Sequence, residues 1–255
     1  MKMYMLALGL SLPTVLGLFT GCSPKAETAS GSDSLKIVAT IFPEYDWVRQ
    51  VLGDRAGEVQ LTLLLDSGTD LHSYQPTAAD MLTIGECDLF LYNGGESDAW
   101  VERVLATAAN PDRRTLSVME VLGDSVLEEE VVEGMQEAED HDHAEGEAHE
   151  EEADEHVWLS LRNARTACAE IARVLGELDP DHAAEYQTNA ENYMAELEAL
   201  DGEYAALAEN AARRTVLVGD RFPFRYLVDD YGLTYYAAFS GCSAETEASF
   251  ETVAF

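Results

Sequence analysis

The chain has 255 residues, and its 49 acidic and 15 basic side chains give a formal net charge of -34 at pH 7. A surface this acidic repels a phosphate backbone, which excludes nucleic acids as natural partners. Cations are the ligands that such a charge favours.

The first 21 residues predict a signal peptide. Lys2 precedes an apolar run from Met3 to Phe19 that ends just before Gly21 and Cys22. Pro13 interrupts the run and its flanks are short, so processing is favoured over a permanent membrane span. No later segment is apolar for long enough to cross a bilayer, so we expect a protein that works outside the membrane with partners.

The segment Phe19-Thr20-Gly21-Cys22 resembles a bacterial lipobox, although leucine is usual at its first position. The resemblance implies cleavage before Cys22 and lipidation of that cysteine, and hence an extracytoplasmic protein anchored to the bacterial cell membrane. Residues 22–34 would then be a flexible polar tether. The alternative is an ordinary secretory cleavage that leaves Cys22 free.

Strands and helices alternate between residues 35 and 127, which we predict to be an N-terminal α/β lobe. The predicted strands cover 35–41, 59–65, 88–92 and 115–118, and the predicted helices cover 45–52, 77–85 and 97–109. This order favours a parallel sheet flanked by helices.

Residues 128–155 interrupt the alternation. No Lys or Arg occurs between Arg114 and Arg162, and the interval is crowded with carboxylates. Such a segment buries little apolar surface, so we expect a flexible, acidic, histidine-rich loop. The histidines are His141, His143 and His149.

Two helical stretches follow the loop. The first, 161–178, completes the N-terminal lobe together with the rest of 156–180, and the second, 181–210, is long enough to be a linking spine. Its apolar positions recur at helical spacing, so we expect one stripe to face a core. The stripe comprises Tyr186, Tyr193, Leu197, Leu200, Tyr204 and Leu207.

Alternation resumes in residues 211–255, with predicted strands at 215–219 and 234–239 and a predicted helix at 224–230. The last eight residues look like the opening of a further helix, so we expect this second lobe to be incomplete. The predicted fold is therefore α/β, with two lobes that each contain a parallel sheet flanked by helices, joined by a long rigid helix.

Three side chains are candidate metal ligands. His72 follows a predicted strand, at the sheet edge where parallel sheets bind ligands, and His156 lies where the acidic loop re-enters the fold. Asp220 ends a strand of the second lobe. Imidazole and carboxylate together suit zinc. The alternatives are a turn histidine that bonds the backbone, and an aspartate that caps the next helix.

Cysteine chemistry is not expected to contribute. Beyond Cys22 the chain has Cys87, Cys168 and Cys242, an odd number without CxxC spacing. A disulfide framework or a cysteine zinc site is therefore disfavoured, and we expect all three to be small buried residues.

Several motifs, in order, resemble the metal-binding solute receptors of zinc and manganese ABC transporters. They are Ile37-Val-Ala-Thr-Ile-Phe-Pro43, Asp70-Leu-His-Ser-Tyr-Gln-Pro76, Asp88-Leu-Phe-Leu-Tyr-Asn-Gly94, Glu155-His-Val-Trp-Leu-Ser160 and Tyr231-Gly-Leu233. The resemblance implies two lobes with a metal held between them, and His72 and His156 at two of the ligand positions. The third, His or Glu in the family, falls on Asp220 when counted from the strand and on Arg221 when counted back from Tyr231. We favour Asp220, because a protonated guanidinium cannot ligate. The fourth family ligand would lie beyond Phe255.

The resemblance also implies partners, namely ABC permease and ATPase subunits, and a monomer that carries out no bond chemistry. Imidazole favours zinc over manganese, so we expect zinc as the transported ligand, with manganese as the alternative. The loop histidines could collect zinc, or the loop could be solvated sequence with no role in binding. A zinc hydrolase is disfavoured, since His149-Glu-Glu-Glu-Ala153 lacks the second histidine of HExxH. A surface adhesin without a tight metal site is a further alternative.

Overall fold

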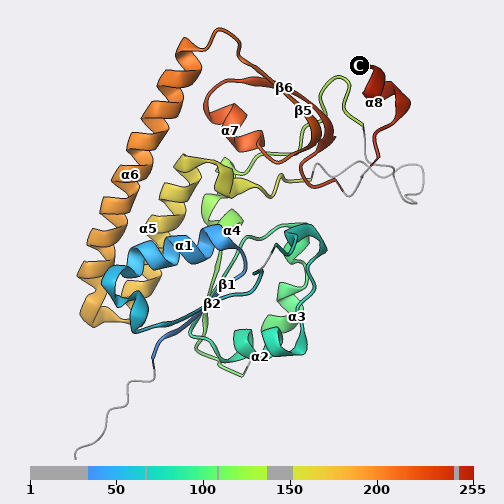
Figure 1. Cartoon of the computed structure of the whole chain (residues 1–255). Helices are drawn as coiled ribbons and strands as arrows, with labels where there is room; N and C mark the ends of the chain where they lie inside the picture. Colours follow the sequence, from blue (N-terminus) through green and yellow to red (C-terminus); the bar gives the residue numbers. More distant parts are fainter. Residues whose placement is uncertain (1–33, 67, 108, 137–151, 244–246) are drawn as a thin grey trace, which may run out of the picture. The chain divides into compact units, whose positions relative to one another are not determined.

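The computed structural model describes residues 34–66, 68–107, 109–136, 152–243 and 247–255 (Figure 1). All described residues belong to one compact unit, Ser34–Phe255. The predicted signal peptide, Cys22 and nearly all of the tether therefore lie outside the described residues. The described part contains no helix whose length and apolarity would let it span a bilayer.

Four short parallel strands form the first sheet, in the order β2-β1-β3-β4. They are β1 (Lys36–Ala39), β2 (Gln60–Leu63), β3 (Leu89–Tyr92) and β4 (Arg114–Ser117). All four predicted strands of this lobe are present, each with ends within two residues of those expected, and the parallel arrangement is confirmed.

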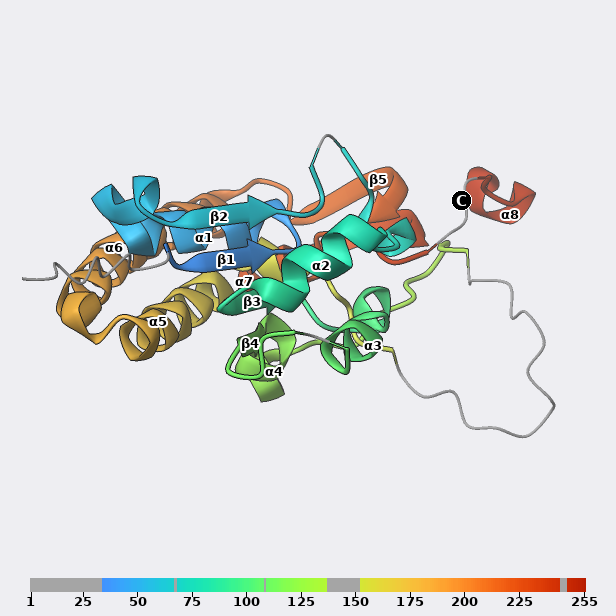
Figure 2. The ribbon, with the colours of Figure 1, turned by 90° about the horizontal axis from the view of Figure 1, so that it is seen from below.

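Helices cover both faces of this sheet. On one face Ile37 and Leu89 pack with α1 (Phe42–Leu52), α4 (Val118–Leu122) and α5 (Leu161–Leu178). On the other, Val38 and Phe90 pack with α2 (Ala78–Glu86) and α3 (Val101–Leu105). Figures 1 and 2 show α2 and α3 across the sheet from α1 and α5. The alternating strand residues therefore build two separate cores.

The helix predicted over 97–109 is shorter in the structure. A 3₁₀ turn, Glu96–Asp98, precedes the five residues of α3. The buried Asp98 side chain accepts a hydrogen bond from the Gly94 amide at 2.9 Å, which ties this turn to the loop after β3. Gly95, which precedes the turn, has a φ of 80°, a conformation that suits glycine.

The long predicted helix is present as α6 (Ala183–Asn210), preceded by a 3₁₀ turn at Pro180–His182. Tyr186 and Leu197 are buried as expected, but the end of the predicted stripe is not: Leu200, Tyr204 and Leu207 are 41%, 40% and 69% exposed. The reason is the length of α5, its main neighbour, which has 18 residues against the 28 of α6. The last turns of α6 therefore extend past α5 (Figure 1).

Two parallel strands, β5 (Thr215–Phe222) and β6 (Thr234–Ser240), form the second sheet, with α7 (Arg225–Asp230) between them in sequence. A short helix, α8 (Phe250–Ala254), ends the chain as expected. Strand β5 runs three residues beyond the predicted end at Gly219, and its register shifts between Val218 and Arg221. That shift moves the side chains of the last residues of β5 relative to a regular strand.

The expectation that residues 128–155 form one flexible loop is wrong at both ends. Glu128 bridges Ala153 in antiparallel fashion, and Met135 is buried in a third core with Phe222 and Tyr235. The physical reason is that a few apolar residues within the acidic stretch find a partner in the second sheet. Residues 137–151, with His141, His143 and His149, lie outside the described part.

Glu44, in the first turn of α1, is a fully buried acid. Its Oε2 accepts hydrogen bonds from the Thr40 amide (3.0 Å), the Thr40 hydroxyl (2.8 Å) and the Ile41 amide (3.2 Å), whereas Oε1 has no hydrogen-bond partner. Burial, and then the charge of Asp98, raise the pKa of Glu44 to about 8. Glu44 therefore keeps a proton at neutral pH.

We expect Glu44→Gln to change how stability depends on pH. The carboxyl ionises near pH 4.5 in the unfolded chain but only near pH 8 in the folded protein. Its contribution to the unfolding free energy is therefore fully present below about pH 4.5 and is lost as the pH rises to about 8. The amide mimics the neutral acid and does not titrate. The unfolding free energy of the variant should rise relative to the parent between about pH 5 and 8, by on the order of a few kcal/mol. Denaturant titrations measure this, and equal pH slopes would contradict it. Glu44→Ala, which leaves the Thr40 and Ile41 donors unpaired, should destabilise throughout.

Candidate metal centre

His72 and His156 come together although 84 positions separate them in the chain. His72 lies in a 3₁₀ turn, Leu71–Ser73, which Asp70 caps by accepting a hydrogen bond from the His72 amide at 3.1 Å. His156 caps a second 3₁₀ turn, Val157–Leu159. The two Nε2 atoms lie 3.3 Å apart. The predicted convergence of the two imidazoles is therefore seen in the fold.

Both Nδ1 atoms have partners that accept hydrogen bonds. His72 Nδ1 lies 3.0 Å from Ser97 Oγ and 3.4 Å from a carboxylate oxygen of Glu155. His156 Nδ1 lies 3.0 Å from Asp154 Oδ1, which also accepts from the His156 amide at 2.8 Å. A proton on each Nδ1 leaves both Nε2 lone pairs facing the same point. This is the tautomer that a metal requires.

The separation of the Nε2 atoms fits a single metal ion. Two imidazole nitrogens bound to one tetrahedral zinc at about 2.0–2.1 Å lie roughly 3.3 Å from each other, which is the separation found here. Without a cation, two facing lone pairs repel. The fold therefore holds the histidines in an arrangement that a dication stabilises.

Glu155 is the acid that orients His72. Its side chain accepts hydrogen bonds from the Ser97 amide at 2.7 Å and from the Ser97 hydroxyl. Burial raises the pKa of Glu155, but the hydrogen bonds from His72 and Ser97 outweigh burial and lower it overall. The same hydrogen bond to Glu155 raises the pKa of His72, against the opposing effect of burial. Glu155 is therefore ionised and strengthens His72 as a donor.

A third donor, Cys242, lies beside the two histidines, and sequence reasoning missed it. One donor atom from each of His72, His156 and Cys242 can be chosen so that all lie within 4.8 Å of one another. Cys87 and Cys168 are fully buried, as expected, but Cys242 is partly exposed. Burial and the Glu129 carboxylate raise the pKa of the Cys242 thiol. The available signal was its place, two residues past the carboxyl end of a parallel strand.

Asp220 does not join this group. It is exposed on β5, and its carboxylate accepts a hydrogen bond from the Arg221 amide at 2.8 Å. Arg221 instead points toward the centre: its guanidinium lies 3.7 Å from Asp70 and 3.4 Å from the Ser243 carbonyl. Because β5 continues past Gly219 with a shifted register, counting along the sequence selects the wrong side chain for the metal centre.

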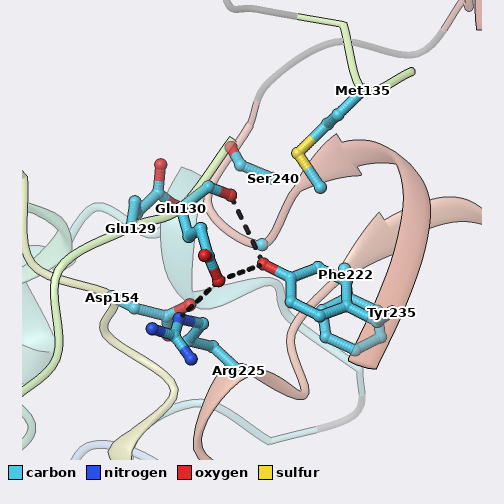
Figure 3. A pocket seen from close by; sticks show the side chains of 9 residues that line it. Glu129, Glu130, Met135, Asp154, Phe222, Arg225, Tyr235 and Ser240 are labelled. Carbon is cyan, nitrogen blue, oxygen red and sulfur yellow. Dashed lines mark hydrogen bonds and ion pairs between the residues drawn. The ribbon is translucent and has the colours of Figure 1, made fainter. Parts of the chain in front are cut away.

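Figure 3 shows a small polar pocket, two of whose lining residues, Asp154 and Gly241, contact the His156 ring. Arg225 and Tyr235, also in its lining, converge on Glu130, each at 3.4 Å from Glu130 Oε2. The pocket is lined by elements of the second sheet and by both ends of the acidic segment. Of its carboxylates, Asp154 contacts the His156 ring, and Glu130 is paired with Arg225.

Comparisons with known proteins identify relatives whose names state that they bind or take up zinc. The zinc-binding lipoprotein AdcA of Streptococcus pneumoniae serotype 4 is 34% identical over 242 residues, which are 95% of this chain and 46% of that protein. The high-affinity zinc uptake system protein ZnuA of Bacillus subtilis is 30% identical over 232 residues, 91% of this chain and 69% of that protein.

A solved structure, Zn(II)-bound AdcA from Streptococcus pneumoniae, has a similar fold, with a TM-score of 0.65, 29% identity, and coverage of 87% of this chain and 42% of that one. The chain spans about half the length of the AdcA relatives. Residues 37–255 match the family model described as zinc-uptake complex component A, periplasmic (ZnuA). Since this match covers most of the sequence, the chain belongs to the ZnuA family.

Proposed function

We propose that this protein is an extracytoplasmic receptor that binds zinc with high affinity and delivers it to the permease of an ABC importer, whose ATPase subunits drive uptake. The observation that carries the proposal is the pair of Nε2 atoms 3.3 Å apart, each on a ring whose Nδ1 has a partner that accepts a hydrogen bond. The names of the relatives, zinc-binding lipoprotein and zinc uptake system protein, support zinc as the ligand. The predicted signal peptide and the lipobox-like segment that ends at Cys22 support a lipid anchor outside the membrane.

Binding requires no bond chemistry, and we propose a receptor rather than an enzyme. The site is assembled from parts far apart in sequence: Tyr226, in α7, donates a hydrogen bond to the Asp154 carbonyl at 2.7 Å, next to His156. Arg221, in β5, lies near Asp70, which caps the turn of His72. Residues of β5 and α7 therefore contact the chain beside both histidines, so a metal that orders these segments can alter the surface that a permease meets. Manganese remains the alternative ligand, and the imidazole pair favours zinc.

Replacing either histidine by alanine should abolish tight zinc binding. Loss of a supporting residue behind a ligand typically costs roughly 10- to 100-fold in affinity, so loss of His72 or His156 itself should raise the Kd by at least about 100-fold. His182→Ala is the matched control, because that ring bonds Asp179 on the spine side of the fold. Competition titrations against a chelator measure the tight site, and melts of the zinc-free variants check folding. A parent that binds zinc no more tightly than His72→Ala would refute the proposal.

Zinc affinity should fall as the pH is lowered. A proton on His72 Nε2 occupies the position that the metal needs, and the bond to Glu155 raises the pKa of His72 above its usual value. Competition therefore begins above about pH 6.5, the usual histidine pKa, and grows as the pH falls. Titrations between about pH 8 and 5 test this, and a constant Kd across that range would rule out histidine ligation.

A further inference from the structure

Cys242 lies at the metal centre in a position that neither the ligand pattern of its family nor its own sequence context assigns. We propose that the Cys242 thiolate is the third protein ligand, so that the metal is bound by two imidazole nitrogens and one sulfur. This inference rests on the proposed function, since it takes His72 and His156 to hold the metal.

The first support is the contact between the Cys242 turn and His156. Strand β6 ends at Ser240, and Gly241 follows directly against the imidazole. A Cβ at Gly241 would lie 2.9 Å from His156 Cε1 and 2.9 Å from the Phe222 carbonyl oxygen, which is closer than real Cβ atoms approach. Only glycine allows the turn to come this near. The result is that Cys242 Sγ lies 4.0 Å from His156 Nδ1.

The second support is that contacts from separate elements fix the backbone of the turn. The Cys242 amide donates to Glu129 Oε1 at 3.0 Å, from the start of the acidic segment. Arg221, from β5, donates to the carbonyl of Ser243 at 3.4 Å. The backbone on both sides of Sγ is therefore held, while the side chain can still rotate about χ1 toward the two Nε2 atoms.

The third support is the contrast with the other cysteines in the described residues. Cys87 Sγ donates to the Ile84 carbonyl at 3.2 Å within the core around α2 and α3, and Cys168 is packed in the core beneath α5. Both are fully buried among apolar side chains. Cys242 is in neither core and lies among His156, Glu129 and Arg221. Its surroundings are those of a ligand rather than of a packing residue.

The geometry needs only a small adjustment. In a tetrahedral site with Zn–S near 2.3 Å and Zn–N near 2.0–2.1 Å, the sulfur lies roughly 3.5 Å from each nitrogen. One donor atom from each of the three residues can be chosen so that all lie within 4.8 Å of one another, and rotation about χ1 of Cys242 is the adjustment that would bring the sulfur to bonding distance. On binding, the thiol proton leaves to solvent and the sulfur lone pair forms the bond to the metal.

A sulfur donor determines which metals the site accepts. Thiolate is a soft ligand that suits zinc, cadmium and cobalt, whereas manganese prefers oxygen donors. With Cys242 as a ligand, this one residue therefore sets the preference of the site for zinc over manganese.

The test uses Co²⁺ as a spectroscopic probe in the full chain. Thiolate coordination gives a sulfur-to-cobalt charge-transfer band in the near ultraviolet, which imidazole and carboxylate do not give. We expect the band in the parent, its loss in Cys242→Ser, and its retention in the control Cys168→Ala, which removes a thiol away from the site. Zinc Kd should rise by roughly 10- to 100-fold in Cys242→Ser, and the preference for zinc over manganese should fall.

A second measurement does not depend on the variant folding. In the parent, zinc should protect Cys242 from alkylation by iodoacetamide, read by mass spectrometry of the Cys242 peptide. Absence of the charge-transfer band, with a Cys242 that zinc does not protect, would overturn sulfur ligation. If the histidine variants still lose zinc in that case, the receptor function stands; if the parent itself fails to bind zinc, both proposals fail.

Discussion

The metal centre depends on two imidazole rings whose Nε2 lone pairs face each other. His72 and His156 present Nε2 atoms at 3.3 Å, and the Nδ1 of each is tied to Ser97 and Glu155 or to Asp154. Without a cation the two lone pairs repel, and the hydrogen bond to Glu155 raises the pKa of His72, which favours a proton on that ring. A proton and a dication therefore compete for one position, which couples metal affinity to pH without any moving part.

The carboxylates behind the rings make this arrangement rigid. Glu155 is buried against Gly95, where a Cβ would collide with its carboxylate, and its backbone carbonyl accepts a hydrogen bond from Asn93 at 2.8 Å. The loop after β3 thus orients His72, although it lies in a different part of the sequence. A parallel sheet makes this possible, because the loops that follow its strands converge at one edge. The short strands of the first sheet serve mainly to place these loops together.

The pattern of apolar residues along the sequence was sufficient to predict most helices and strands, and the ends of those elements pointed to His72 and His156 as candidate ligands. Alternating apolar runs identified every strand, and the bounds of α5 are those expected, because burial on one face leaves a clear periodicity. His72 and His156 could be chosen because each flanks an ordered element. The exposed end of α6 could not be predicted, since it depends on how far α5 extends beside it.

The third donor shows why counting along a strand fails. Asp220 was favoured on the assumption of a strand that ends at Gly219, but β5 continues to Phe222 with an altered register. Cys242 was expected to be a small buried residue because the three cysteines after Cys22 are an odd number without CxxC spacing. Its relevance arises from Gly241, which packs on His156, and that contact is tertiary. A rule about cysteine spacing cannot detect a site in which the other ligands are histidines.

The same contacts show how the two described ends of the acidic segment support the metal centre. At its start, Glu129 holds the amide of Cys242; at its end, Asp154 holds the ring of His156. Both ends of the segment are thus fastened at the metal centre, and Met135 anchors the first end in the core of the second sheet. Negative charge fixed beside a cation site raises the local concentration of cations. Among the described residues, the carboxylates of Glu129 and Asp154 therefore place negative charge at the centre and also hold the Cys242 turn and the His156 ring in place.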